Sequence, residues 1–193
     1  MKNYKSKVSL AVLIIAAIIG TSACMNSKPE DTKEVAEENN EEKFDNNSTE
    51  KDAQFFVNAA EMSFQEISLG KLAQQKGNVN HVKELGKMME DEHTKSLADL
   101  TALAEAKNIT LPNSQTDKGK DAYEKLSKKS GNDFGKTYCD MLVNAHQEAI
   151  ALFEKASTEC TDPEIKAWAS ATLPTLRTHL GHALTSQKEC KKI

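Results

Sequence analysis

The sequence contains few of the residues that interrupt helices or build sheets. Only 8 glycines and 4 prolines occur in 193 residues, and aromatic residues make up 5% of the chain. Strands favour aromatic and β-branched residues, and turns depend on Gly and Pro. No segment alternates apolar and polar residues for long enough to predict a strand. Because Ala, Leu, Glu and Lys are abundant, we expect an all-α fold.

The chain also has no excess of positive charge and no recognisable catalytic motif. The formal net charge is -4, and no cluster of Lys and Arg forms a basic face, so we expect no nucleic-acid partner. A nucleophile elbow, a phosphate-binding loop and a pair of catalytic carboxylates at a known spacing are all missing. We therefore expect a binding or interaction role rather than catalysis.

No apolar run is long enough to cross a bilayer. The longest, Val8 to Ile19, spans about 12 residues, follows three lysines and precedes Gly20-Thr21-Ser22-Ala23-Cys24, which is the pattern of a signal peptide. Small residues before a cysteine resemble the lipobox of bacterial lipoproteins, although Thr21 replaces the usual leucine. We expect residues 1–24 to be a lipoprotein signal peptide and Cys24 to carry the lipid. An ordinary secretory signal is the alternative.

Residues 25–49 are acidic and nearly devoid of apolar side chains. Such a segment buries too little surface to offset the entropy of ordering it, so we expect a disordered tether between the membrane and the domain. No aspartate follows Cys24, which favours the outer membrane, with the domain facing the periplasm. The location is thus predicted to be the cell envelope.

Residues 50–190 have the periodicity of four long amphipathic helices. The first begins at the capping-box pattern Thr49-x-x-Asp52 and ends at Gly77, and the second ends near Lys107. Residues 108–130 form a longer connection with a short helix, which permits a crossover. The third helix spans about 131–160. Asp162-Pro163 starts the fourth, in which Pro174 predicts a kink or break.

Several separated blocks resemble a bacterial family of unknown function over about Gln54 to Ala183. Its members are labelled outer-membrane or exported proteins and are grouped with ferritin-like four-helix bundles. The resemblance implies two antiparallel helical hairpins, but no assigned reaction. The blocks are FVNAAEMSFQEISLGKLAQQKGNVNHVKELGKMMEDEH, LPN, GNDFGKTYCDMLVNAHQEAIALFEKAS and DPEIKAWASATLPTLRTHLGHA.

Four polar residues fall on or beside the apolar stripes of the four predicted helices. They are Glu66, His93, His146 and His179, and each lies about 11 to 15 residues from the same end of the bundle. They can therefore converge in one layer. Carboxylate and imidazole groups suit one transition metal ion, such as iron, zinc or copper.

Glu90-x-x-His93 adds an i, i+3 pair that directs a carboxylate and an imidazole to one metal. The ferritin-like di-iron pattern needs a second such pair, but Val143 and Leu176 stand three residues before the other two histidines, so we expect no di-iron centre.

The competing hypothesis is a non-catalytic structural or interaction lipoprotein that binds no metal. Its histidines would form a hydrogen-bonded polar layer in the core. His81 and His182 are expected at the surface or rim.

Three cysteines follow Cys24. Cys160 and Cys190 lie at opposite ends of the last helix, about 45 Å apart, and cannot form a disulfide. Cys139 and Cys190 come closer if the last two helices are antiparallel. Whether they are bridged stays open.

Overall fold

The computed structural model describes residues 29–44 and 46–192, and these form six α-helices. No strand occurs within these ranges, which confirms the predicted all-α fold. In chain order the helices are α1 (Thr32–Lys43), α2 (Asn47–Lys76), α3 (Asn80–Ala106), α4 (Asp117–Ser127), α5 (Gly131–Glu159) and α6 (Pro163–Cys190).

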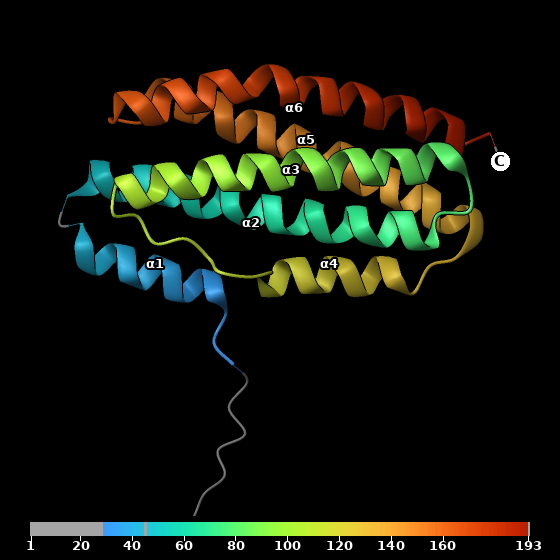
Figure 1. Cartoon of the computed structure of the whole chain (residues 1–193), viewed down its shortest axis with the longest axis horizontal. Helices are drawn as coiled ribbons and strands as arrows, with labels where there is room; N and C mark the ends of the chain where they lie inside the picture. Colours follow the sequence, from blue (N-terminus) through green and yellow to red (C-terminus); the bar gives the residue numbers. More distant parts are fainter. Residues whose placement is uncertain (1–28, 45, 193) are drawn as a thin grey trace, which may run out of the picture.

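Four long helices pack around one interior. The short turns after α2 and α5 make α2–α3 and α5–α6 antiparallel hairpins, as Figure 1 shows. Helix α2 also packs against α5, and α3 packs against α6, so each long helix contacts two others. The two predicted hairpins are present, whereas the grouping with ferritin-like proteins remains a prediction.

Helix α4 carries the chain back along the outside of the bundle. It lies beside α2 and returns from the end where α3 finishes to the end where α5 begins (Figure 1). Because of this crossover, α3 and α5 run in the same direction. The side chains of α4 thereby cover one face of the α2–α5 pair.

The start of α2 differs in detail from the predicted capping box. Asn46 is the N-cap, and its side chain accepts a hydrogen bond from the backbone N–H of Thr49. Asp52 instead accepts the backbone N–H groups of Thr161 and Asp162, in the turn between α5 and α6. A side chain expected to act locally therefore links the two hairpins.

Helix α1 corrects the prediction of a disordered segment over residues 25–49. Asp31 caps α1, and Asn40 is buried, where its side chain bonds both the N–H and the C=O of Thr110. Lys33 forms an ion pair with buried Glu61 on α2 at 3.0 Å. Polar contacts to the rest of the fold thus order α1, although its own apolar content is low. The folded domain therefore begins before residue 50, where the sequence predicted its start.

Helix α6 runs without a break from Pro163 to Cys190, so the break expected at Pro174 does not occur, whereas the kink stays a prediction. A proline at this place removes the hydrogen bond to the carbonyl of Ser170, and its ring crowds that carbonyl. Both Ser170 and Pro174 are exposed, so water can satisfy that carbonyl. The second half of α6, which carries buried His179, therefore continues the same helix along the bundle.

The predicted signal peptide (residues 1–24) and the lipidation site Cys24 lie outside the described residues. In the part of the chain that is described, no helix is both long enough and apolar enough to span a membrane.

Candidate functional site: a three-histidine cluster

The buried apolar residues form two separate clusters, one toward each end of the bundle. One contains Phe55, Leu100, Phe153 and Ile165, and the other contains residues such as Leu69, Met89, Phe134 and Tyr138. Along each long helix the two clusters are interrupted at the same level. The four interrupting residues are Glu66, His93, His146 and His179, as predicted, and all four are buried.

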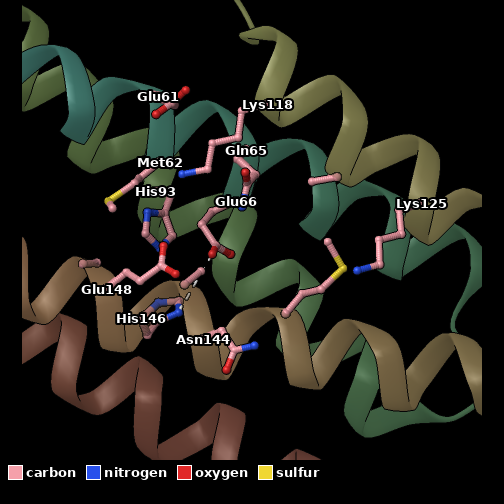
Figure 2. A pocket seen from close by; sticks show the side chains of 14 residues that line it. Glu61, Met62, Gln65, Glu66, His93, Lys118, Lys125, Asn144, His146 and Glu148 are labelled. Atoms are coloured by element: carbon pink, nitrogen blue, oxygen red, sulfur yellow. Dashed lines mark ion pairs between the residues drawn. The ribbon is translucent and has the colours of Figure 1, made fainter.

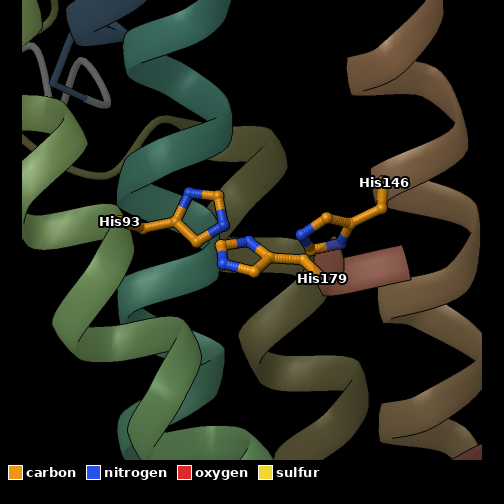
Figure 3. A group of neighbouring side chains, drawn as sticks. All are labelled: His93, His146 and His179. Carbon is orange, nitrogen blue, oxygen red and sulfur yellow. The ribbon is translucent and has the colours of Figure 1, made fainter. Parts of the chain in front are cut away.

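Three of these residues meet in the centre of the bundle. His93 on α3, His146 on α5 and His179 on α6 point their rings at one another, as Figure 3 shows. One ligand nitrogen from each ring lies within 4.8 Å of the others. The ring centroids are 5.3–5.6 Å apart. The structure thus brings together three side chains that are far apart in the sequence.

Helical periodicity explains why these rings face inward. Met89 lies one turn before His93, Leu142 one turn before His146, and Leu176 nearly one turn before His179, and all three apolar side chains are buried. The apolar neighbours hold each helix face against the core. The histidines share that face and must therefore be buried with them.

Two of the rings are oriented by a hydrogen bond on the side away from the cluster. His146 Nδ1–H donates to the carbonyl oxygen of Leu142 at 3.0 Å. His179 Nε2–H donates to a carboxylate oxygen of Glu92 at 2.7 Å. Each bond fixes the tautomer and leaves the lone pair of the other ring nitrogen free, which is how metal-binding histidines are usually held.

The nitrogens on the inner side have no hydrogen-bond partner among the described residues. They are Nε2 of His93, Nε2 of His146 and Nδ1 of His179, and all three atoms are buried. A buried polar atom without a partner typically costs about 1–3 kcal/mol. Three such atoms in one place therefore constitute an unsatisfied set of nitrogen donors.

The rings of His93 and His146 are uncharged at neutral pH, because the pKa of each is lowered. Desolvation, followed by the charges of the other two histidines, lowers the pKa of His93 well below its usual value. Desolvation lowers the pKa of His146 to about 4, against a smaller opposing effect of its bond to Leu142. A neutral imidazole is the form that binds a metal ion.

Glu66 lies beside the cluster rather than within it. Its carboxylate is 4.0 Å from His146 Nδ1, and both of its oxygens are buried without a hydrogen-bond partner in the described chain. Desolvation raises its pKa to about 8. Glu66 therefore holds its proton at neutral pH and can release it when positive charge arrives nearby.

Glu90, the other predicted carboxylate ligand, is not part of the cluster. It accepts a hydrogen bond from Gln74 at 2.5 Å and pairs with Lys71 at 3.8 Å, and both partners belong to α2. The i, i+3 spacing placed Glu90 near the same face, but it lies at the α2–α3 contact. His182 is exposed and His81 is half-buried, as expected of surface or rim residues.

A cavity of about 350 Å³ leads from the surface to the cluster between α2, α4 and α5. Buried Glu66, His93 and His146 lie at its inner end (Figure 2). Its other lining residues include four exposed ones, namely Lys118, Lys125, Asn144 and Glu148. A small polar molecule can therefore approach two of the three histidines from this side.

Sequence reasoning missed Glu92, Tyr138 and the contribution of α4. Glu92 is half exposed and follows no motif, so only the packing of α3 against α6 reveals its bond to His179. Tyr138 is buried, its hydroxyl has no partner in the described residues, and desolvation and Glu66 raise its pKa. Lys118 on α4 joins the cavity only because of the crossover.

The fold and the site define an all-helical bundle protein with a buried histidine cluster between two apolar cores. The chain belongs to the family described as a domain of unknown function, DUF4142, whose profile matches residues 37–185. This range begins inside α1 and includes every residue of the cluster. No curated protein and no solved structure matches the chain significantly.

Proposed function

We propose that this protein is a cell-envelope module that binds one transition metal ion at His93, His146 and His179. The observation that carries the proposal is a buried cluster of three histidines in which one ligand nitrogen from each ring lies within 4.8 Å of the others. Each ring also has a buried nitrogen without a hydrogen-bond partner in the described chain. Zinc lies about 2.0–2.1 Å from its histidine nitrogens, so small side-chain rotations would close this set around an ion.

The alternative of a hydrogen-bonded polar layer has less support. Within the described chain no hydrogen bond joins the three histidines to one another, and the oxygens of Glu66 have no partner. A layer of this kind stabilises a core when every member is satisfied and weakens it when members are not. The outward bonds to Leu142 and Glu92 orient the rings, but they leave the inner nitrogens unsatisfied.

The donor set favours zinc, iron or copper, because imidazole is a ligand for all three. Three protein ligands leave a coordination position for water or a small exogenous ligand. The cavity that ends at His93 and His146 supplies a route to that position. A second metal is not part of the proposal, since Glu90 bonds to α2 and Glu66 stands outside the cluster.

The envelope location rests on the sequence pattern of residues 1–24. A lipid on Cys24 would hold the domain at a membrane, and residues 25–31 would leave only a short connection before α1. The outer membrane, with the domain facing the periplasm, is the proposed site. Ferritin-like ancestry of the bundle belongs to the same proposal and is supported by its hairpins and crossover.

The direct test is metal analysis of the full chain carrying Cys24→Ser, which removes lipidation and one thiol. Purified protein is stripped with a chelator, loaded separately with zinc, cobalt, copper and ferrous iron, and desalted. We expect about one ion per chain for at least one metal. Cobalt should also give the absorption bands of a low-symmetry, nitrogen-rich site.

Single substitutions to Ala at His93, His146 and His179 should each remove the bound ion. His182→Ala is the matched control, because this exposed histidine lies on α6 outside the cluster. Circular dichroism confirms that each variant is helical. Retention of the metal by all three cluster variants, or no stoichiometric ion with any of the four metals, contradicts the proposal.

A further inference from the structure

Two cysteines meet at the end of the bundle where α6 finishes. Cys139 on α5 and Cys190 on α6 have Sγ atoms 3.7 Å apart, and both side chains are fully buried. The thiol of Cys139 also donates to Ser186 Oγ at 3.3 Å. Neither residue contributes to the histidine cluster, so this site is independent of the proposed metal.

Gly135 makes room for this contact. A Cβ atom at Gly135 would lie 3.2 Å from Cys190 Sγ and 3.3 Å from a methyl group of Val82. Gly135 stands one turn before Cys139 on the same face of α5. The missing side chain therefore lets the Cys190 thiol lie directly against α5, next to its partner.

His81 lies on the other side of Cys190. Its Nε2 is 3.3 Å from Cys190 Sγ, which suits the transfer of a proton from the thiol to the ring. Burial raises the pKa of Cys190 and also that of Cys139. Since the thiolate is the reactive form, a neighbouring base is what such a pair requires.

Cys190 is also positioned for access. It is the last residue of α6, and only a turn of two lysines follows it in the described chain. Helix ends open more easily than helix centres. An opening of this last turn would expose Cys190, whereas Cys139 would stay covered within α5.

We propose that Cys139 and Cys190 form a redox-active dithiol that exchanges with small disulfides such as oxidised glutathione. Cys190 gives its proton to His81, and the thiolate attacks one sulfur of the oxidant. The oxidant's S–S bond breaks, and the first small thiolate leaves and takes up a proton.

Cys139 then loses its proton to solvent, and its sulfur attacks Cys190. The mixed disulfide breaks and releases the second small thiol. Two protein thiols are oxidised and one small disulfide is reduced to two thiols. The new bond joins α5 to α6 and closes a long loop of chain.

The test uses the reduced full chain with Cys24→Ser, incubated with oxidised glutathione, alkylated and mapped by peptide mass spectrometry. We expect a monomer that has lost two hydrogen atoms, a Cys139–Cys190 peptide, and an alkylated Cys160. The oxidised protein should unfold several degrees higher than the reduced one. Cys160→Ser, which keeps the pair intact, should give the same product.

Cys139→Ser should retain a glutathione adduct on Cys190, because no second thiol is there to displace it. His81→Ala should slow the formation of the bond by about 100-fold without changing the product, because loss of a general base typically costs at least this factor. Stable glutathione adducts on the unsubstituted pair, cross-linking between chains through Cys160, or reaction of Cys139 and Cys190 only in denaturant would each overturn the proposal.

Discussion

Glu92 on α3 accepts a 2.7 Å hydrogen bond from His179 on α6, and this bond turns the other nitrogen of the His179 ring toward the histidine cluster. A carboxylate that orients a metal-binding histidine typically contributes a factor of 10 to 100 to metal affinity. This contact also joins the two hairpins at the level of the site. Its removal therefore tests the geometry of the cluster without altering a ligand.

We expect Glu92→Ala to weaken binding of zinc or cobalt by about 10- to 100-fold while the stability of the metal-free protein changes little. Glu92 is half exposed, so its loss leaves no cavity. Competition with a chromophoric chelator measures the affinity. Asp91→Ala is the matched control, since Asp91 pairs with Lys87 at the surface. Equal effects of both substitutions would show that general charge, rather than orientation of His179, sets the affinity.

Glu66 gives the metal-free protein a specific pH dependence. Its pKa is about 8 in the folded chain and near 4.5 when solvated, so the folded state binds more protons between these values and stability falls as pH rises. From pH 6.5 to 8 the expected loss is about 1–2 kcal/mol in the free energy of unfolding. In the folded state, the histidines with lowered pKa values do not titrate in this window.

Urea unfolding at the same pH values should give a free energy of unfolding that changes less with pH for Glu66→Gln than for the unsubstituted protein. The amide of Gln has nearly the same shape as the carboxyl group of Glu, but it does not titrate. Zinc should oppose the effect by favouring the ionised carboxylate. Parallel pH profiles for the two proteins would mean that Glu66 is already ionised at pH 6.5.

Below pH 6.5 the lowered pKa values of His93 and His146 act in the opposite direction. Below pH 6.5 the histidines of the unfolded chain bind protons, whereas the buried rings of the folded chain stay neutral. The contribution of His93 and His146 to stability is therefore present above about pH 6.5 and is lost as pH falls toward 4. We expect His146→Gln to reduce this acid-side loss in metal-free protein. Unfolding curves at pH 4.5, 5.5 and 6.5 provide the measurement, and an unchanged slope would contradict burial of a neutral ring.

Helices α2 and α3 approach closely at Gly70 and Gly86. A Cβ atom at Gly86 would lie 2.7 Å from the Gly70 carbonyl oxygen and 2.8 Å from the Cβ of Ala73. We therefore expect Gly86→Ala to lower the free energy of unfolding by about 1–3 kcal/mol, because the two helices must separate. Gly181→Ala is the control: a Cβ there meets nothing, and the helix should gain about 0.5–1 kcal/mol. Equal effects of the two changes would exclude a tight α2–α3 contact.

Asn40 tests whether α1 belongs to the folded domain. Asn40→Ala removes both bonds to Thr110, at 2.7 and 2.8 Å, from a buried position. Amide hydrogen exchange should rise across α1 while α2 stays protected. Asn39→Ala, which removes only a bond within α1 to Val35, should leave exchange nearly unchanged. Rapid exchange of α1 in the unsubstituted protein would restore the picture of a disordered tether.

The sequence by itself determined the helical class, the approximate limits of the four long helices and the level at which Glu66, His93, His146 and His179 interrupt the apolar stripes. These features follow from local periodicity and capping, which depend on residues a few positions apart. The DP pattern at Asp162-Pro163 marked the start of α6 for the same reason.

Only the tertiary structure decided which of the polar residues meet. Glu90 and Glu92 stand three residues and one residue before His93 in the sequence, yet Glu90 bonds to α2 and Glu92 bonds to His179. The order in α1 and the contact of Cys139 with Cys190 likewise arise from partners 51 to 70 positions away. Such choices depend on helix rotation and on which helices are neighbours, and the energy that fixes both comes from packing the whole core.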